Sequence, residues 1–249
     1  MAIKNIETSH LVHDLKNPVN IIETGARSLL DKQDRYGELT DRQEKVIRRM
    51  LRSALKLRAL ANNMLEVDMA SKGITKTTEC NMADILRHSL LEVLDVMDPS
   101  ISEKLDDVLD FKAVRDMLKS YHIYLECDDS QMLKGIQLDE TKMGLIVTNL
   151  LSNAFKYREK SVFLKCNIDG ECITISVRDD GPGIPESYHQ KVFDQYFQCV
   201  PCEGFPVRGH GLGLAGAQAL AEALGGNLCL CKTDQGAEFI VQVKTSNME

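Results

Sequence analysis

Two apolar seams with heptad spacing run through the first seventy residues. In each seam the apolar positions follow one another at alternating steps of three and four residues. The first seam consists of Val12, Leu15, Val19, Ile22, Ala26 and Leu29, and the second of Ile47, Met50, Ala54, Leu57, Ala61 and Met64. Such spacing is typical of helices that pack against one another along their length. The N-terminal part of the chain is therefore predicted to form two long helices.

A short break separates the two seams. Residues 34–39, which include Gly37, interrupt the first pattern, and Thr40 with Gln43 three residues later predicts a capping box at the start of the second helix. That helix is expected to end near Gly73, because glycine favours a helix C-terminus. A single hairpin of this kind cannot bury both seams well. We therefore expect two copies to pair into a dimeric four-helix bundle.

Beyond residue 74 the pattern changes to short strands that alternate with helices. Strands are predicted at 74–79, 121–127, 162–168, 172–177, 228–232 and 238–243, and helices at 82–96, 141–157 and 212–224. Asp169-Gly170 is a strong hairpin signal. The fold class is thus α+β: residues 1–73 form the hairpin and residues 74–249 a two-layer α/β sandwich. Residues 98–119, also predicted helical, are interpreted either as a partner-binding insertion or as an amphipathic cover for the sheet edge.

Composition excludes several functions. The net charge of −7 over 249 residues argues against an extended nucleic-acid footprint. No run of 18 apolar residues is present that could span a bilayer, and the N-terminus lacks the apolar run of a signal peptide. A cytoplasmic location is expected. The eight cysteines are interpreted as small buried hydrophobes, although Cys199 with Cys202, or Cys229 with Cys231, could pair around a metal or in a redox reaction.

The chemistry of the second half is concentrated in three clusters. Asn149, Asn153 and Lys156 share one face of the helix predicted at 141–157, with Tyr157 beside them. Amide oxygens suit Mg²⁺, and a lysine can neutralise phosphate charge.

The other two clusters are rich in glycine. Asp179-Asp-Gly-Pro-Gly183 follows a strand and makes a rigid turn, and its first aspartate could accept a hydrogen bond from the exocyclic amine of adenine. Gly209-His-Gly-Leu-Gly-Leu214 opens a helix, whose N-terminal amides suit phosphate.

In their order and spacing these clusters resemble the nucleotide boxes of the histidine-kinase catalytic domain, in the GHKL ATPase superfamily. Residues 149–157 resemble its N box, 179–183 its first glycine box, 192–197 its F box and 209–214 its second glycine box. The resemblance implies an ATP site beneath a lid at about residues 184–210. Asn149 stands where ATPases of the wider superfamily often carry a glutamate base. The resemblance therefore favours phosphoryl transfer over hydrolysis.

The resemblance also implies a role for each site residue. Asp179 would contact the adenine amine, Tyr157 would lie beside adenine, Asn153 would bind Mg²⁺ with help from Asn149, and Lys156 would contact phosphate. Arg208 is interpreted either as a γ-phosphate contact or as a surface arginine. The remaining residues expected to border the nucleotide are Gly181, Gly183, Gly209, Gly211, Leu212 and Gly213.

The first helix carries a candidate phosphoryl acceptor. With Val12 and Leu15 at seam positions, His13 and Asn17 fall outside the seam, four residues apart on one side of the helix. Asp14 could orient the imidazole and take up its proton. Pro18 costs about 3 kcal/mol in a helix interior, which indicates a functional reason for its presence.

His13-Asp-Leu-Lys-Asn-Pro18 resembles the H box of dimeric histidine kinases. The resemblance implies autophosphorylation of His13 from Mg²⁺ and ATP, followed by transfer to an aspartate in the receiver domain of a response regulator. It also implies that Asn17 can position water for dephosphorylation of that partner. The expected partners are a second copy of the chain, a response regulator, and an upstream sensor protein or a sensor domain outside this sequence. Two alternatives stay open, namely an ATPase that does conformational work and a degenerate kinase that acts as a scaffold.

Overall fold

The computed structural model describes residues 8–106, 108, 110–194, 197 and 213–245. The chain divides into two compact units between Lys72 and Gly73. Each unit has its own helices and its own buried apolar residues. None of the described helices combines the length and the apolar character needed to cross a membrane.

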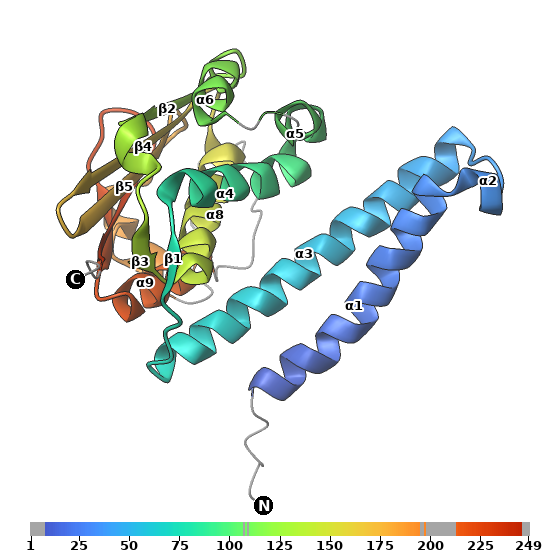
Figure 1. The fold of residues 1–249 in the computed structure, drawn as a ribbon, viewed down its shortest axis with the longest axis horizontal. Helices are drawn as coiled ribbons and strands as arrows, with labels where there is room; N and C mark the ends of the chain where they lie inside the picture. The colour runs from blue at the N-terminus through green and yellow to red at the C-terminus, as the bar shows by residue number, and fades with distance from the viewer. Residues whose placement is uncertain (1–7, 107, 109, 195–196, 198–212, 246–249) are drawn as a thin grey trace, which may run out of the picture. The chain divides into compact units, whose positions relative to one another are not determined.

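The first unit is a helical hairpin (Figure 1). Its helices are α1 (Thr8–Asp31), the single turn α2 (Gln33–Tyr36) and α3 (Asp41–Ser71). The predicted capping box is present: the Thr40 side chain accepts from the backbone N–H of Gln43, and the Gln43 side chain accepts from the backbone N–H of Thr40. Gly37, at a φ of 90°, follows α2 in a conformation that favours glycine.

Only alternate seam positions are buried within this hairpin. On α1 the buried positions are Val12, Val19 and Ala26, and on α3 they are Ala54 and Ala61. The intervening positions are exposed: Leu15, Ile22, Leu29, Met50, Leu57 and Met64 retain between 36 and 52% of their accessible surface. Ile47, the remaining seam position, is half-buried. One hairpin therefore covers alternate positions of each seam and leaves the intervening positions exposed along both helices.

A buried carboxylate links α1 to α3. Glu23 is 8% exposed, and its Oε2 lies 2.5 Å from Nη1 of Arg58 on the opposite helix. Arg27, one turn along α1, donates its Nε–H to the other carboxylate oxygen at 3.1 Å. A buried charge is tolerated only when it is paired, so this contact fixes which turns of the two helices face each other.

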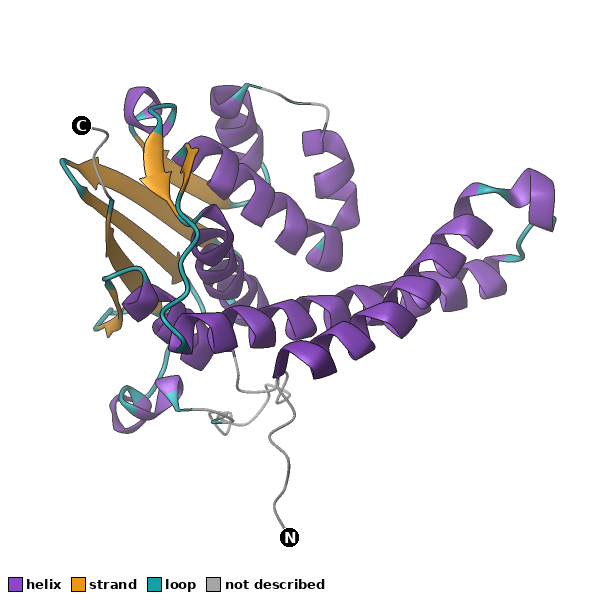
Figure 2. Ribbon diagram, turned by 60° about the horizontal axis from the view of Figure 1, so that its bottom comes forward, coloured by secondary structure: helices purple, strands orange, loops and turns teal. Residues whose placement is uncertain are grey.

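The second unit is a layer of helices on a five-stranded sheet (Figures 1 and 2). The strands are β2 (Ile123–Cys127), β4 (Val162–Asp169), β5 (Cys172–Asp179), β6 (Asn227–Cys231) and β7 (Glu238–Lys244), in the order β2-β4-β5-β7-β6. Strands β2 and β4 are parallel, and the other neighbours are antiparallel. The helical layer consists of α4 (Met82–Met97), α8 (Glu140–Tyr157) and α9 (Gly213–Ala223).

A second, smaller sheet was not expected from the sequence. It pairs β1 (Thr78–Cys80) with β3 (Ile136–Leu138), and the short helix α7 (Asp129–Met132) precedes β3. The prediction of a strand at 74–79 was therefore wrong over its first four residues. The Lys76 N–H donates to Oδ2 of Asp139 at 2.9 Å instead of to a strand.

Asp139 is also the N-cap of α8, where it holds a buried ion pair. Its Oδ1 accepts from the backbone N–H of Lys142 at 3.1 Å, and its Oδ2 accepts from the Lys142 ammonium at 2.7 Å. The two residues are only 3% and 1% exposed. Burial acts to raise the pKa of Asp139, but its bonds with Lys142 and with the Lys76 N–H hold that pKa below its usual range. The start of α8 is thereby fixed.

Two helices occupy the segment between α4 and β2. These are α5 (Pro99–Asp106), which packs on α4, and α6 (Phe111–Lys119), which packs on the edge strand β2. The apolar face of α6 is buried through Phe111, Val114 and Leu118. These contacts favour the interpretation as an amphipathic cover for the sheet edge.

Candidate functional site

Helix α8 carries a polar stripe along one margin of its buried face. Its buried residues are Lys142, Met143, Ile146, Val147, Leu150, Leu151, Ala154 and Phe155. Asn149 and Asn153, one turn apart between these positions, are half-buried. Two half-buried amides on one face provide adjacent oxygen donors of the kind that Mg²⁺ prefers.

Helix α9 begins directly beside this stripe. A Cβ atom added to Gly213 would lie 3.1 Å from the side-chain oxygen of Asn149. A side chain at this position would require the Asn149 side chain to shift by a few tenths of an ångström. The last glycine of the predicted second glycine box therefore touches the first residue of the predicted N box, although 64 residues separate them.

Lys156 and Tyr157 interact with each other at the C-terminal end of α8. The Lys156 ammonium donates to the Tyr157 hydroxyl at 2.8 Å and lies 4.5 Å from the centroid of its ring. Tyr157 is 39% exposed, so part of its side chain is accessible to a ligand. A cation over an aromatic ring is favourable, and in this structure it turns Lys156 towards the tyrosine.

Asp179 is buried at the end of β5. It is 4% exposed, and its Oδ1 accepts from the N–H groups of Gly181 and Ala237 at 2.9 and 3.4 Å. Burial raises the pKa of Asp179 above its ordinary value, while these two N–H groups act in the opposite direction. A buried carboxylate of this kind is suited to accept hydrogen bonds from a ligand.

The glycines of this loop are required by close backbone contacts. A Cβ at Gly181 would lie 2.1 Å from the carbonyl oxygen of Tyr157, and one at Gly183 would lie 2.8 Å from that of Gly236. Gly236 has a φ of 76°, and a Cβ there would lie 1.8 Å from the carbonyl oxygen of Asp179. The loop is thus held between the end of α8 and the β6–β7 turn.

Sequence reasoning missed two residues of this arrangement. Gly236 lies in the turn between β6 and β7. The sequence predicted this turn but not its contact with Asp179. Asp180 accepts from the N–H groups of Glu159, Lys160 and Ser161, but next to Asp179 it was not singled out. No local pattern reports either contact, because each joins segments that are distant in the sequence.

The predicted acceptor residues lie on α1. His13 is within the helix, and Pro18 interrupts its backbone hydrogen bonding in the interior. Asp14 and Asn17 are exposed, as expected for positions outside the seam. Arg208, Gly209, Gly211 and Leu212 lie outside the described residues.

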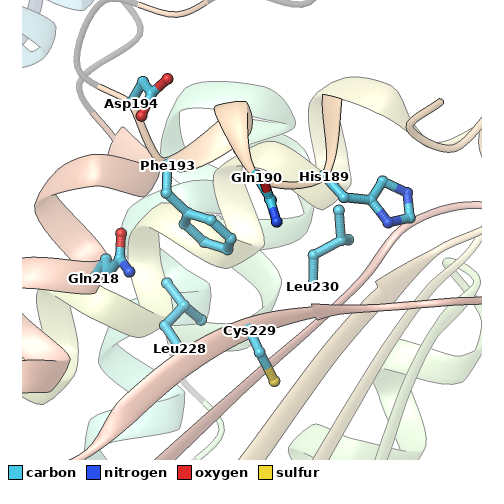
Figure 3. Close-up of a pocket in the computed structure, with 8 residues that line it drawn as sticks. All are labelled: His189, Gln190, Phe193, Asp194, Gln218, Leu228, Cys229 and Leu230. Atoms are coloured by element: carbon cyan, nitrogen blue, oxygen red, sulfur yellow. The ribbon is translucent and has the colours of Figure 1, made fainter. Parts of the chain in front are cut away.

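A cavity of about 520 Å³ lies beside the F-box segment (Figure 3). It is bordered by the end of the turn η1 (Glu186–Tyr188), by η2 (Lys191–Phe193), by α9 and by β6. Its lining consists of His189, Gln190, Phe193, Asp194, Gln218, Leu228, Cys229 and Leu230. None of the described N-box and glycine-box residues is in this lining, so the cavity is separate from the predicted nucleotide site.

The described cysteines are all free thiols. Burial raises the pKa of Cys166 to about 12 and that of Cys80 to about 11. Such thiols are poor nucleophiles, because the thiolate is the reactive form. Cys229 is exposed and Cys231 half-buried on the edge strand β6. Within the described part of the chain, no cluster of three or more potential metal ligands is found. Cys199 and Cys202 lie outside it.

Two family models match the chain. The model of the His Kinase A (phospho-acceptor) domain matches residues 3–73, and the model of the histidine kinase-, DNA gyrase B-, and HSP90-like ATPase matches residues 138–247. The chain belongs to the histidine kinase family. It carries the two domains that make up the two-component histidine kinase core.

Curated relatives of this histidine kinase are longer proteins. It is 28% identical over 239 residues to the aerobic respiration control sensor protein ArcB of Escherichia coli, a match that covers 94% of this chain and 28% of ArcB. It is 26% identical over 240 residues to the sensor histidine kinase YkoH of Bacillus subtilis, covering 94% of this chain and 46% of YkoH. The kinase thus spans less than half the length of these two relatives.

Solved structures of other histidine kinases share the fold. Full-length ShkA, solved in complex with AMPPNP, has a TM-score of 0.64 and 24% identity, over 97% of this chain and 46% of ShkA. The histidine kinase AdeS of Acinetobacter baumannii has a TM-score of 0.53 and 15% identity, over 94% of this chain and 98% of AdeS. The α+β fold of this kinase is therefore that of known histidine kinases.

Proposed function

We propose that this chain binds ATP with Mg²⁺, phosphorylates His13 and passes the phosphoryl group to an aspartate of a receiver domain. The observation that carries the proposal is the contact between Gly213 and Asn149. It puts the N-terminus of α9, whose first amides have no partner within the helix itself, beside Asn149 of α8. A nucleoside triphosphate requires both groups: backbone amides that bind its phosphates and side-chain oxygens that coordinate its Mg²⁺.

The base would be held between α8 and the first glycine box. The carboxylate of Asp179 accepts from the exocyclic amine of adenine, and the exposed ring of Tyr157 lies beside the base. Gly181 and Gly183 keep this turn close to the backbone of neighbouring segments. The same residues would select adenine, because a buried acceptor rejects a base that presents an oxygen at that position.

The phosphates would extend towards Asn149, Asn153 and Gly213. The two amide oxygens fit Mg²⁺, which would neutralise phosphate charge when bound. The Lys156 ammonium donates one hydrogen bond to the Tyr157 hydroxyl, and its other two N–H groups are suited to contact phosphate. The proposed phosphate-binding residues also include Arg208, Gly209, Gly211 and Leu212.

His13 accepts the phosphoryl group. A ring nitrogen of its imidazole forms the new bond to the γ-phosphorus, the bond from that phosphorus to the β–γ bridging oxygen breaks, and ADP leaves. Asp14 stabilises the positive charge on the ring and accepts its proton. The site has an amide at Asn149 instead of a carboxylate base, so water is activated poorly. Transfer to histidine is favoured over hydrolysis.

Asn17, exposed one turn after His13, is suited to position water when the phosphorylated partner is dephosphorylated.

Homodimerisation follows from the exposed half of each seam. Six large seam side chains of α1 and α3 are 36–52% exposed, so covering each of them gains about half of the roughly 1.5–3 kcal/mol that full burial of such a side chain provides. A second hairpin with the same pattern would cover these side chains, and the two hairpins together would form a four-helix bundle.

We also expect the kinase to act in the cytoplasm, where ATP is available, under the control of a sensor protein or domain.

The test is incubation of the purified chain with γ-labelled ATP and Mg²⁺, beside His13→Ala and Asn153→Ala. We expect acid-labile, alkali-stable label on the wild type and none on either variant. His13→Ala should still bind nucleotide, whereas Asn153→Ala should not. Label that persists on His13→Ala would contradict the acceptor assignment. Phosphate release that is unchanged by His13→Ala, without any protein label, would indicate an ATPase instead.

A further inference from the structure

The carboxylate of Asp180 binds three consecutive backbone amides. Its Oδ1 accepts from the N–H groups of Glu159, Lys160 and Ser161 at 3.0, 3.0 and 2.9 Å. Its Oδ2 also accepts from the Ser161 N–H at 2.9 Å. Successive amides that converge on one anion form a nest, and bonds to an ionised acceptor are about twice as strong as neutral ones. The turn between α8 and β4 is therefore fixed mainly by one side chain.

The pKa of Asp180 agrees with this geometry. Burial acts to raise it, but the amides of Lys160 and Ser161 hold the pKa below the usual range of a carboxyl group. Asp180 is consequently ionised at neutral pH and acts as an acceptor of hydrogen bonds.

This side chain joins two segments that carry adenine contacts. The turn it holds begins directly after Tyr157 and Arg158 at the end of α8. Asp180 itself lies between Asp179 and Gly181, and Gly181 abuts the carbonyl of Tyr157. A third segment is connected to the same residue, because the side-chain amide of Gln235 donates to the Asp180 carbonyl at 3.2 Å.

We propose that Asp180 is a positioning residue for the nucleotide: it sets the affinity for ATP by fixing Tyr157 and Asp179 relative to each other, without contact to ATP. The proposal rests on the nucleotide site proposed above. The hydrogen bonds of its carboxylate go to the backbone amides of residues 159–161 and to the Ser161 side chain, all within this turn. Its effect on binding is therefore exerted through the geometry of its neighbours.

Two conservative variants of Asp180 distinguish the effect of the position of its carboxylate on ATP binding from the effect of its charge. Asp180→Asn keeps an oxygen at the same place and loses the charge, whereas Asp180→Glu keeps the charge and displaces it by one methylene. We expect Asp180→Asn to bind ATP within about threefold of the wild type and Asp180→Glu to bind at least about tenfold more weakly, comparable to losing one well-formed hydrogen bond. Affinity is measured by calorimetry with a non-hydrolysable ATP analogue and Mg²⁺, on the full chain and below the melting temperature of each variant.

Asp110→Ala provides the matched control. Asp110 caps α6 by accepting the Ala113 N–H at 3.0 Å, in the same unit and away from the glycine boxes. This variant should melt at a lower temperature and bind the analogue as the wild type does. The proposal is overturned if Asp180→Glu binds like the wild type, or if Asp180→Asn is the weaker of the two, which would indicate a role of the charge. If the wild type does not bind the analogue, the proposed function itself fails.

Discussion

Three aspartates in the second unit show how environment decides the role of a carboxylate. Asp139 is paired with a buried lysine and Asp180 is surrounded by amides, and both have lowered pKa values. For Asp179, also buried, burial outweighs the N–H groups that it accepts, among them those of Gly181 and Ala237, and raises its pKa. The first two are arranged to stabilise structure. Asp179 retains an energetic cost that a ligand can relieve.

Replacement of Asp179 by asparagine should stabilise the protein and weaken ATP binding. A raised pKa in the folded state means that the contribution of the carboxyl group to stability is present at acid pH and is lost as the pH rises through that value. At pH 7 the buried charge is therefore unfavourable, and Asp179→Asn should raise the melting temperature by a few degrees at most. This gain should shrink as the pH falls and disappear at acid pH, where the carboxyl group is protonated in both the folded and the unfolded state.

The same substitution should weaken ATP binding by at least about tenfold, because an amide N–H₂ group replaces an acceptor opposite the adenine amine. Thermal unfolding at pH 7 and pH 4 and a nucleotide titration measure the two effects. A lower melting temperature at pH 7 would contradict the argument, since it would mean that the ionised carboxylate stabilises the fold through the Gly181 and Ala237 amides.

At the scale of elements, the seams of α1 and α3 consist of alternating buried and exposed positions. The small or β-branched residues Val12, Val19, Ala26, Ala54 and Ala61 are buried between the two helices of one hairpin. Small side chains allow the two backbones to approach closely. The larger leucine, isoleucine and methionine positions remain at the surface. This division by size indicates that the intramolecular contact and the proposed intermolecular contact are built from alternate seam positions.

Charge on the exposed seam should separate the proposed dimer. Leu57 is 52% exposed, and Leu57→Glu combined with Met64→Glu would place four carboxylates in the bundle of two chains. We expect a monomer by light scattering coupled to size exclusion, with helical content retained. Leu133→Glu, at a leucine that is 64% exposed on the second unit, is the control and should remain dimeric. A wild-type protein that is monomeric at micromolar concentration would contradict the assignment.

At the scale of the whole molecule, the division between Lys72 and Gly73 separates two activities that the proposed function requires. The described nucleotide-box residues belong to the second unit and His13 belongs to the first. Each unit has its own buried apolar residues.

A fragment of residues 73–249 should therefore bind ATP and fail to become labelled. Its affinity for a non-hydrolysable ATP analogue is expected to be within about threefold of that of the full chain, since domains with their own cores fold independently. Addition of the unlabelled hairpin with His13 intact should restore some transfer, and the His13→Ala hairpin should not. A fragment that is unfolded by circular dichroism would show that the hairpin contributes to the stability of the second unit.

Local sequence patterns were sufficient for much of this structure. The heptad spacing predicted both long helices, and Thr40 with Gln43 predicted the cap between them. Most of the remaining strands and helices were predicted to within two residues of their ends. These features depend on neighbours within a few positions of the chain, where periodicity, capping and turn chemistry apply directly. The same holds for the stripe of Asn149 and Asn153, which depends only on helical geometry.

Only the tertiary structure determined the contacts between residues that are distant in the sequence. β1 is limited to three residues because its only partner among the described strands is the three-residue β3, which lies more than fifty residues later. Lys156 turns to Tyr157, Gly236 abuts Asp179 and Asp180 binds the amides of residues 159–161. Which half of each seam is buried depended on the packing of α1 against α3. The sequence by itself determined the elements and the chemical groups on their faces. Their contacts were decided only on folding, because the free energy of a buried polar group or a close backbone approach depends on what surrounds it.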